Sequence, residues 1–132
     1  MQLISLVLLV GFSYYMFSLL KRQFATKKMV SPQVNQKIQA LIKDHPIFVA
    51  SKTYCPYCSA TKKTLSSITG DAYVLELDTI DDGAEIQDAL QELTGQRSVP
   101  NIFIAGEHIG GNSDLQALHS KDQLVPKIKA AL

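Results

Sequence analysis

The sequence predicts an α/β fold in which helices flank a four-stranded mixed β-sheet. Helical and strand-like patterns alternate along residues 29–132. One pair of strands is joined by a helix, which makes the pair parallel, and another by a two-residue turn, which makes it antiparallel. The length of 132 residues and the hydrophobic content of 46% allow one packed domain of ordinary size. Residues 1–28 are expected to lie outside it.

The first expected helix of the domain covers residues 32–43. Ser31 offers a side-chain oxygen that can cap the helix, and Pro32 suits the first turn, where a backbone N–H has no helical partner. Apolar residues then recur at helical spacing. The pair His45-Pro46 is expected to end the helix.

Two strands and the helix between them form the expected βαβ unit. Ile47–Ala50 is a short apolar run, typical of a buried strand, and Tyr73–Leu77 is predicted to be the second strand. The helix between them begins near Pro56 and runs to about Ile68, before Gly70. A helical crossover of this kind makes its two strands parallel.

A third helix and a hairpin follow. Asp82 and Glu85 are three residues apart and predict a capping box at the start of the helix, which Gly95 ends. The segments 101–104 and 107–109 are expected to pair across a two-residue Ala-Gly turn.

The C-terminal region is predicted to be helical. Ser113 and Gln116 indicate a second capping box, and Pro126 is expected to break the helix. The resulting order is α-β-α-β-α-β-β-α-α. A Cys-X-X-Cys sequence, here Cys55 to Cys58, beside a βαβ unit is typical of a thioredoxin-like fold.

Cys55 and Cys58 are the only cysteines of the chain, so they form no disulfide framework and indicate catalysis or metal binding. The first lies just before a helix and the second one turn inside it. Unpaired N–H groups and the helix dipole, together with Lys52, favour the thiolate of Cys55. We therefore expect Cys55 to be the nucleophile and Cys58 to be the buried resolving thiol, on a turn made rigid by Pro56.

Charge argues against a nucleic-acid partner. Four of the 13 basic residues lie in residues 1–28, so the domain keeps nine basic residues beside all 12 acidic ones. A nucleic-acid-binding domain normally carries a concentrated positive charge. The scattered lysines of the domain are expected to be solvated.

Residues 3–20 are apolar and uncharged, and a basic cluster follows them at positions 21, 22, 27 and 28. About eighteen such residues are at the lower edge of a membrane span. The positive-inside rule then places the C-terminal side in the cytosol. A mitochondrial presequence and a buried core helix are the alternatives.

Met29 stands at the start of the predicted domain. Initiation there is expected to yield a cytoplasmic form, whereas the full-length chain, with residues 1–28 as a targeting or anchor segment, is expected to be mitochondrial or membrane-anchored.

Three blocks carry a family resemblance: TYCPYC at 53–58, SVP at 98–100 and HIGGNSD at 108–114. Through them, residues 29–132 resemble a dithiol glutaredoxin, close to the fungal cytosolic and mitochondrial type. The resemblance implies a monomeric glutathione-dependent thiol-disulfide oxidoreductase with glutathione as its reducing co-substrate and no metal. Its expected substrates are protein disulfides and glutathionylated proteins, in redox homeostasis and oxidative-stress defence.

The resemblance also implies a glutathione site. Lys52 resembles a lysine that attracts a glutathione carboxylate, and Tyr57, with Tyr54, resembles a wall of the groove. Val99 precedes Pro100, which resembles the family's cis-proline. A cis bond there exposes the backbone of Val99, to which the glutathione peptide can add as a strand-like ligand.

The other implied contacts lie at two helices. Asn112 and Ser113 resemble donors of N–H groups to the γ-glutamyl carboxylate, and Asp114 resembles the acid that meets its amine. Gln87 matches a position that contacts the glycine carboxylate, with Arg97 as support.

Plainer interpretations exist. Lys52 and Gln87 are also compatible with ordinary surface positions, and Asp114 with a residue that only stabilises a helix dipole.

A thioredoxin is the nearest enzymatic alternative, but the chain has no tryptophan and has Pro-Tyr between its cysteines. A cluster-binding module is the alternative from another class. Some glutaredoxins bridge an iron-sulfur cluster across a dimer, but these usually relax the position held here by Pro56.

Overall fold

The computed structural model describes residues 2–23 and 29–132. Four strands form one sheet in the order β2-β1-β3-β4. The strands are β1 (Ile47–Ser51), β2 (Tyr73–Glu76), β3 (Asn101–Ile104) and β4 (Glu107–Gly110). Strand β1 is parallel to β2 and antiparallel to β3, which pairs antiparallel with β4. The expected mixed sheet and thioredoxin-like fold are confirmed.

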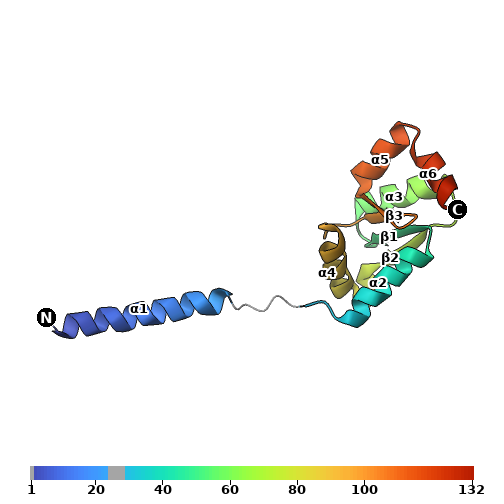
Figure 1. The fold of residues 1–132 in the computed structure, drawn as a ribbon. Coiled ribbons are helices and arrows are strands. Elements are labelled where there is room, and N and C mark those ends of the chain that lie inside the picture. The colour runs from blue at the N-terminus through green and yellow to red at the C-terminus, as the bar shows by residue number, and fades with distance from the viewer. Residues whose placement is uncertain (1, 24–28) are drawn as a thin grey trace.

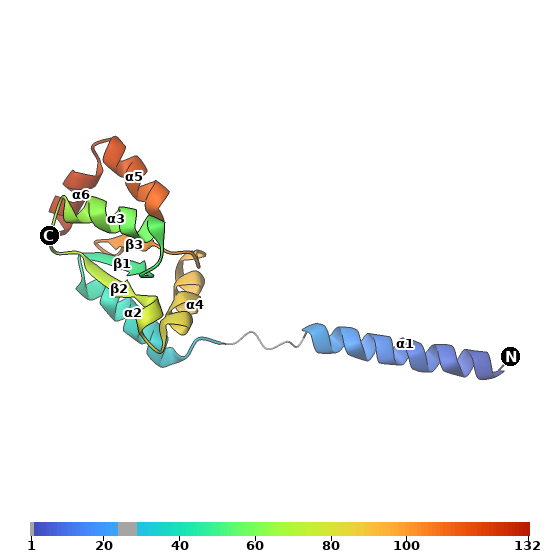
Figure 2. The same ribbon diagram turned by 180° about the vertical axis from the view of Figure 1, so that it is seen from behind.

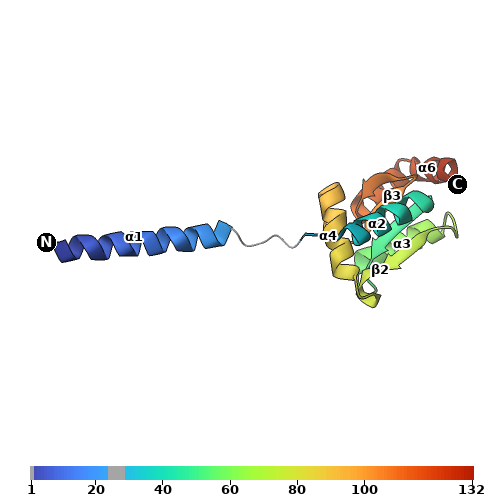
Figure 3. The ribbon, with the colours of Figure 1, turned by 60° about the horizontal axis from the view of Figure 1, so that its bottom comes forward.

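Helices cover both faces of the sheet (Figures 1 and 2). Helices α2 and α4 lie on one face, where they pack against each other (Figure 3), and α3, α5 and α6 lie on the other. Their bounds are α2 (Pro32–Asp44), α3 (Pro56–Ser66), α4 (Gly83–Thr94), α5 (Asn112–Ser120) and α6 (Leu124–Ala131), with a 3₁₀ turn η1 (Leu77–Thr79) after β2. Outside the domain, α1 (Gln2–Gln23) is a single long helix.

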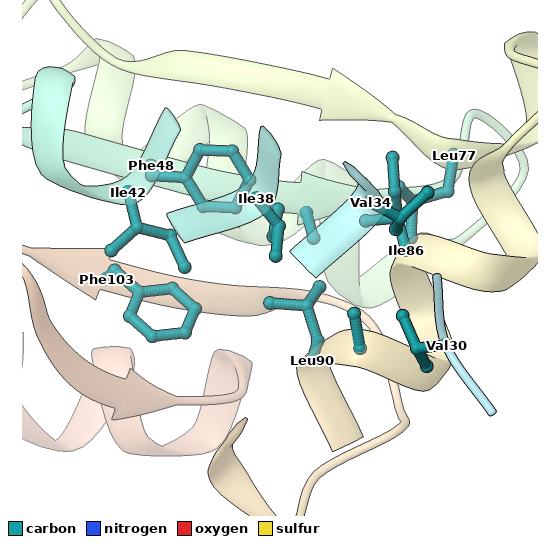
Figure 4. Close-up of a cluster of buried hydrophobic side chains, with 11 residues drawn as sticks. Val30, Val34, Ile38, Ile42, Phe48, Leu77, Ile86, Leu90 and Phe103 are labelled. Atoms are coloured by element: carbon teal, nitrogen blue, oxygen red, sulfur yellow. The ribbon is translucent and has the colours of Figure 1, made fainter. Parts of the chain in front are cut away.

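The two faces of the sheet have separate cores. Along β1, Ile47 and Val49 enter the core under α3, α5 and α6, whereas Phe48 and Ala50 enter the core under α2 and α4. Figure 4 shows the second core, where Phe48 and Phe103 lie beside side chains of α2 and α4. A strand buried on both faces needs a continuous apolar run, which is why residues 47–50 have one.

The start of α2 is capped as expected, and the start of α4 is not. The Ser31 hydroxyl accepts the N–H of Val34 at 3.3 Å. Glu85 accepts the backbone N–H of Ser31 at 2.7 Å, and Asp82 makes an ion pair with Lys37 at 2.7 Å and no side-chain cap. The predicted capping box of Asp82 is therefore wrong, because these carboxylates tie α4 to α2.

The capping box predicted at Ser113 is also wrong. Helix α5 begins after Gly111, whose N–H is accepted by Asp114 Oδ2 at 2.9 Å. The amide of Gln116 instead donates to Thr64 Oγ1 on α3 at 2.9 Å. It links two helices on the same face of the sheet.

Pro126 does not break the C-terminal helix. It lies in the first turn of α6, where a missing N–H removes no helical hydrogen bond. The interruption falls earlier, between the end of α5 at Ser120 and the start of α6 at Leu124.

The hairpin turn between β3 and β4 is confirmed. Ala105 and Gly106 have φ angles of 52° and 77°. Positive φ at both central residues is typical of the type I′ turn, whose twist matches that of paired strands.

Candidate functional site

Cys55 occupies the N-cap of α3 and is half-buried. Its sulfur accepts the backbone N–H of Cys58 at 3.3 Å, in the position that a capping oxygen takes in other helices. The backbone N–H of Cys55 donates to the Lys52 carbonyl at 3.1 Å, which closes the turn before the helix. The site thus presents one sulfur at a helix N-terminus.

Cys58 lies one turn inside α3 and is completely buried. Burial and the hydrogen bond with Cys55 raise the pKa of the Cys58 thiol, although the Lys52 backbone and the Ser51 hydroxyl act in the opposite direction. Cys58 therefore keeps its proton more firmly than an ordinary thiol. The two cysteines differ in burial as expected: Cys55 is partly exposed and Cys58 is enclosed.

A cis peptide bond joins Val99 to Pro100 opposite the cysteines. The Cys55 thiol donates weakly to the Val99 carbonyl oxygen, at 3.8 Å. The Gln96 side-chain amide donates to the carbonyls of Ser98 at 3.1 Å and Pro100 at 3.0 Å. Gln96 therefore fixes the loop from both sides of the cis bond, a role that sequence analysis missed because both bonds are to backbone atoms.

An open cleft of about 380 Å³ lies beside this loop. It is lined by Tyr57, Ser98, Val99, Pro100, Gly111, Asn112 and Ser113. Five of these, Tyr57, Val99, Pro100, Asn112 and Ser113, are glutathione-site residues expected from the sequence, and they come from α3, the cis-proline loop and the start of α5. The cleft is therefore assembled from segments that are far apart in the chain.

Asn112 and Asp114 have structural partners at the α5 end of the cleft. Asn112 Oδ1 accepts the Thr61 hydroxyl at 2.9 Å, so its side chain joins α5 to α3. Asp114 is exposed and does not line the cleft. A Cβ on Gly110 would overlap the Asp114 carboxylate, and the φ of Gly110 is 117°, so only glycine fits there.

Gln87 and Arg97 also lie outside the residues that line the cleft. The Gln87 amide donates to the Arg97 carbonyl at 2.7 Å, and the Arg97 guanidinium makes an ion pair with Asp88. In the free protein both side chains attach α4 to the loop that leads to Ser98.

Lys52 is half-buried just after β1. The next residue, Thr53, is hydrogen-bonded to Asp78, a contact that the sequence did not predict. Asp78 accepts the backbone N–H of Thr53 at 3.0 Å and also accepts its hydroxyl. These hydrogen bonds, with a smaller contribution from the Lys52 charge, lower the pKa of the Asp78 carboxyl. Asp78 was missed because its partner lies 25 positions away in the sequence.

Metal ligands do not gather in the part of the chain that the structure describes, where no three His, Cys, Asp or Glu residues form a group. The His108 ring bonds Asn101 Oδ1 at 2.8 Å, and His45 stacks on Tyr73. These histidines have structural partners.

Comparison with known proteins gives a consistent result. The glutaredoxin family model matches residues 47–109. The glutaredoxin of Ricinus communis is 52% identical over 95 residues, which cover 72% of this chain and 93% of that protein. Glutaredoxin-1 of Saccharomyces cerevisiae is 49% identical over 100 residues, which cover 73% of this chain and 91% of that protein.

Solved structures show the same likeness. A buckwheat glutaredoxin–glutathione complex superposes with a TM-score of 0.73 at 43% identity, over 75% of this chain and 90% of that one. Wheat glutaredoxin superposes with a TM-score of 0.75 at 41% identity, over 81% of this chain and 99% of that one.

Proposed function

Because this chain belongs to the glutaredoxin family and is a glutathione-dependent thiol oxidoreductase, we propose that it reduces protein disulfides and glutathione-protein mixed disulfides through Cys55 and Cys58. One observation carries the proposal: the sulfur of the partly exposed Cys55 caps a helix, and Cys58 lies buried one turn away. The Cys-Pro-Tyr-Cys sequence supports assignment to the dithiol type. The yeast relative supports a resemblance to fungal members, but the Ricinus communis relative is slightly more identical, at 52% against 49%, so plant members are at least as similar.

The first step is attack by the Cys55 thiolate on the glutathionyl sulfur of a mixed disulfide. The protein thiolate leaves and takes up a proton, and Cys55 becomes disulfide-bonded to glutathione. The N–H of Cys58, which Cys55 Sγ already accepts, favours a negative sulfur at this position.

Two routes then regenerate the enzyme. A glutathione thiolate can attack the glutathionyl sulfur, which releases oxidised glutathione and restores Cys55. Alternatively, Cys58 loses its proton and attacks Cys55, which releases glutathione and forms the Cys55–Cys58 disulfide. Two further glutathione molecules then reduce that disulfide. Because burial raises the pKa of Cys58, the second route begins with an unfavourable deprotonation. The first route does not use Cys58 and avoids that step.

The proposed glutathione site is the cleft beside the cis-proline. Val99 lines this cleft, where its backbone suits a strand-like peptide, and the N–H groups of Asn112 and Ser113 at the start of α5 suit a carboxylate. Lys52 and Asp114 are proposed to meet the charged ends of glutathione. Support for this assignment comes from the buckwheat protein, which was solved in complex with glutathione.

Exchange of Cys58 for serine tests the mechanism. The Cys58→Ser variant should keep activity on a glutathionylated peptide, because that reaction needs only Cys55, and should lose activity on a protein disulfide that requires a second thiol. Cys55→Ser should lose both. Loss of peptide deglutathionylation in Cys58→Ser would contradict the one-thiol route.

We also propose that residues 3–20 anchor the full-length chain in a membrane or direct it to mitochondria, and that initiation at Met29 yields a cytoplasmic form. In support, Leu3–Leu20 is one helix, long and apolar enough to cross a bilayer, and none of this stretch is buried. Fractionation of cells that express a Met29→Leu variant tests the second form, because only the smaller species should disappear. An unchanged pair of species would exclude initiation at Met29.

A further inference from the structure

Asp78 and Thr53 meet because their strands end together. Strands β1 and β2 are parallel, and Ser51 pairs with Glu76 at their C-terminal ends. Thr53 lies two residues beyond the first strand, and Asp78 lies two residues beyond the second. Segments that follow the C-terminal ends of neighbouring parallel strands start close together. The Asp78 carboxylate therefore reaches the segment between β1 and the cysteines.

Asp78 holds this segment by two hydrogen bonds. One carboxylate oxygen accepts the Thr53 N–H at 3.0 Å, and the other accepts the Thr53 hydroxyl. The next link is the turn in which the Cys55 N–H donates to the Lys52 carbonyl at 3.1 Å. Asp78 thus holds the backbone of the segment that carries Lys52 and Cys55.

The carboxylate also acts on Lys52 through its charge. Asp78 accepts the backbone N–H of Thr53, the residue that follows Lys52, so its exposed carboxylate lies beside the Lys52 backbone. The Lys52 charge makes the smallest contribution to the lowered pKa of the Asp78 carboxyl. The attraction is mutual, so Asp78 offsets part of the positive potential of Lys52. An anionic substrate that approaches Lys52 is therefore also repelled by the negative charge of Asp78.

We propose that Asp78 is a positioning and specificity-determining residue, which holds the Cys55 segment through Thr53 and weakens the attraction of Lys52 for anionic substrates. The proposal rests on the proposed function, because Lys52 is there assigned to a glutathione carboxylate. The two roles affect different kinetic constants: the hydrogen bonds support attack by Cys55 and so raise kcat, whereas the charge weakens substrate binding and so raises KM.

Two variants separate the hydrogen bonds from the charge. In Asp78→Asn the amide oxygen can accept the Thr53 N–H and the amide nitrogen can donate to its hydroxyl oxygen, so the segment stays in place while the charge is lost. In Thr53→Val the charge remains, and the hydroxyl bond is lost with little change of shape. Asp71→Asn is the matched control, because Asp71 is an exposed aspartate before the other end of β2.

Steady-state kinetics of the full chain with a glutathionylated peptide gives the readout. Asp78→Asn should lower KM by about 2- to 5-fold with kcat nearly unchanged, and the gain should shrink as salt screens the charges. Thr53→Val should lower kcat by about 3- to 10-fold with KM nearly unchanged, the signature of a mispositioned nucleophile. Asp71→Asn should match the wild type.

Other outcomes overturn the proposal. Equal KM values for Asp78→Asn and the wild type, or a gain that does not respond to salt, would remove the charge role. An unchanged kcat in Thr53→Val would remove the positioning role. An inactive wild-type protein would instead contradict the proposed function, so the two failures are distinguishable.

Discussion

Helix α1 and the domain of residues 29–132 use apolar side chains in opposite ways. Along α1, Leu9 is 65% exposed and none of the Leu3–Leu20 stretch is buried. In the domain, Leu90 is 1% exposed within a core between α4 and the sheet. The comparison teaches that hydrophobicity alone does not identify a core. The domain buries its large apolar side chains in its own two cores, whereas α1 leaves its apolar side chains exposed.

The largest effect expected from this difference concerns membrane binding. The full-length chain should float with phospholipid vesicles, and a chain that begins at Met29 should stay in the soluble fraction. Leu9→Asp should weaken binding strongly, because an acidic residue at the centre of a span costs about 3 kcal/mol. Flotation of the full-length chain and the shortened chain to the same degree would refute the anchor.

A pair of identical substitutions sharpens the comparison within the full-length chain. Leu90→Ala should lower the free energy of unfolding of the domain by about 2–5 kcal/mol, because it leaves a cavity in a closed core. Leu9→Ala should change it by less than about 0.5 kcal/mol. Urea unfolding in detergent, followed by circular dichroism, measures both. Similar losses for the two variants would mean that α1 packs on the domain.

The smallest expected effect is on the pH dependence of the stability of the domain, through the buried thiol of Cys58. In the folded state the pKa of Cys58 is raised, so the stability that its buried thiol contributes is present at neutral pH. This contribution is lost as pH rises above the ordinary thiol range, about 8.5, towards the folded-state pKa. Thermal unfolding of reduced Cys55→Ser between pH 7 and pH 10 should show a decline that Cys55→Ser/Cys58→Ser lacks. Parallel curves would contradict the burial effect.

Much of the fold was predictable because its signals are local. The apolar run of β1, the Ser31 cap of α2 and the left-handed Gly95 after α4 each depend on neighbours within a few residues. The Asp82 capping box failed for the opposite reason. Its carboxylate finds Lys37, which is 45 positions away and lies beside it only after α2 and α4 pack together.

The site shows the same limit. Cys55 and Cys58 were identifiable from their spacing, and Tyr57 and Pro100 from recognisable blocks. The side chains that hold these residues in place were not, because Gln96 bonds backbone carbonyls and Asp78 bonds a residue on a neighbouring strand end. The candidate reactive cysteines have a recognisable sequence pattern, whereas the side chains that hold them depend on tertiary contacts that many residue types can make.

The Ala105–Gly106 turn offers a route to a more robust protein. An alanine in the left-handed region is disfavoured, and asparagine tolerates that region better, so Asn-Gly is the preferred pair for this mirror-image turn. The turn lies at the end of the sheet where β1 begins, since Ala105 N–H donates to the Pro46 carbonyl, and the cysteines follow the opposite end of that strand. Engineers can therefore adjust heat tolerance at this position without redesigning the chemistry.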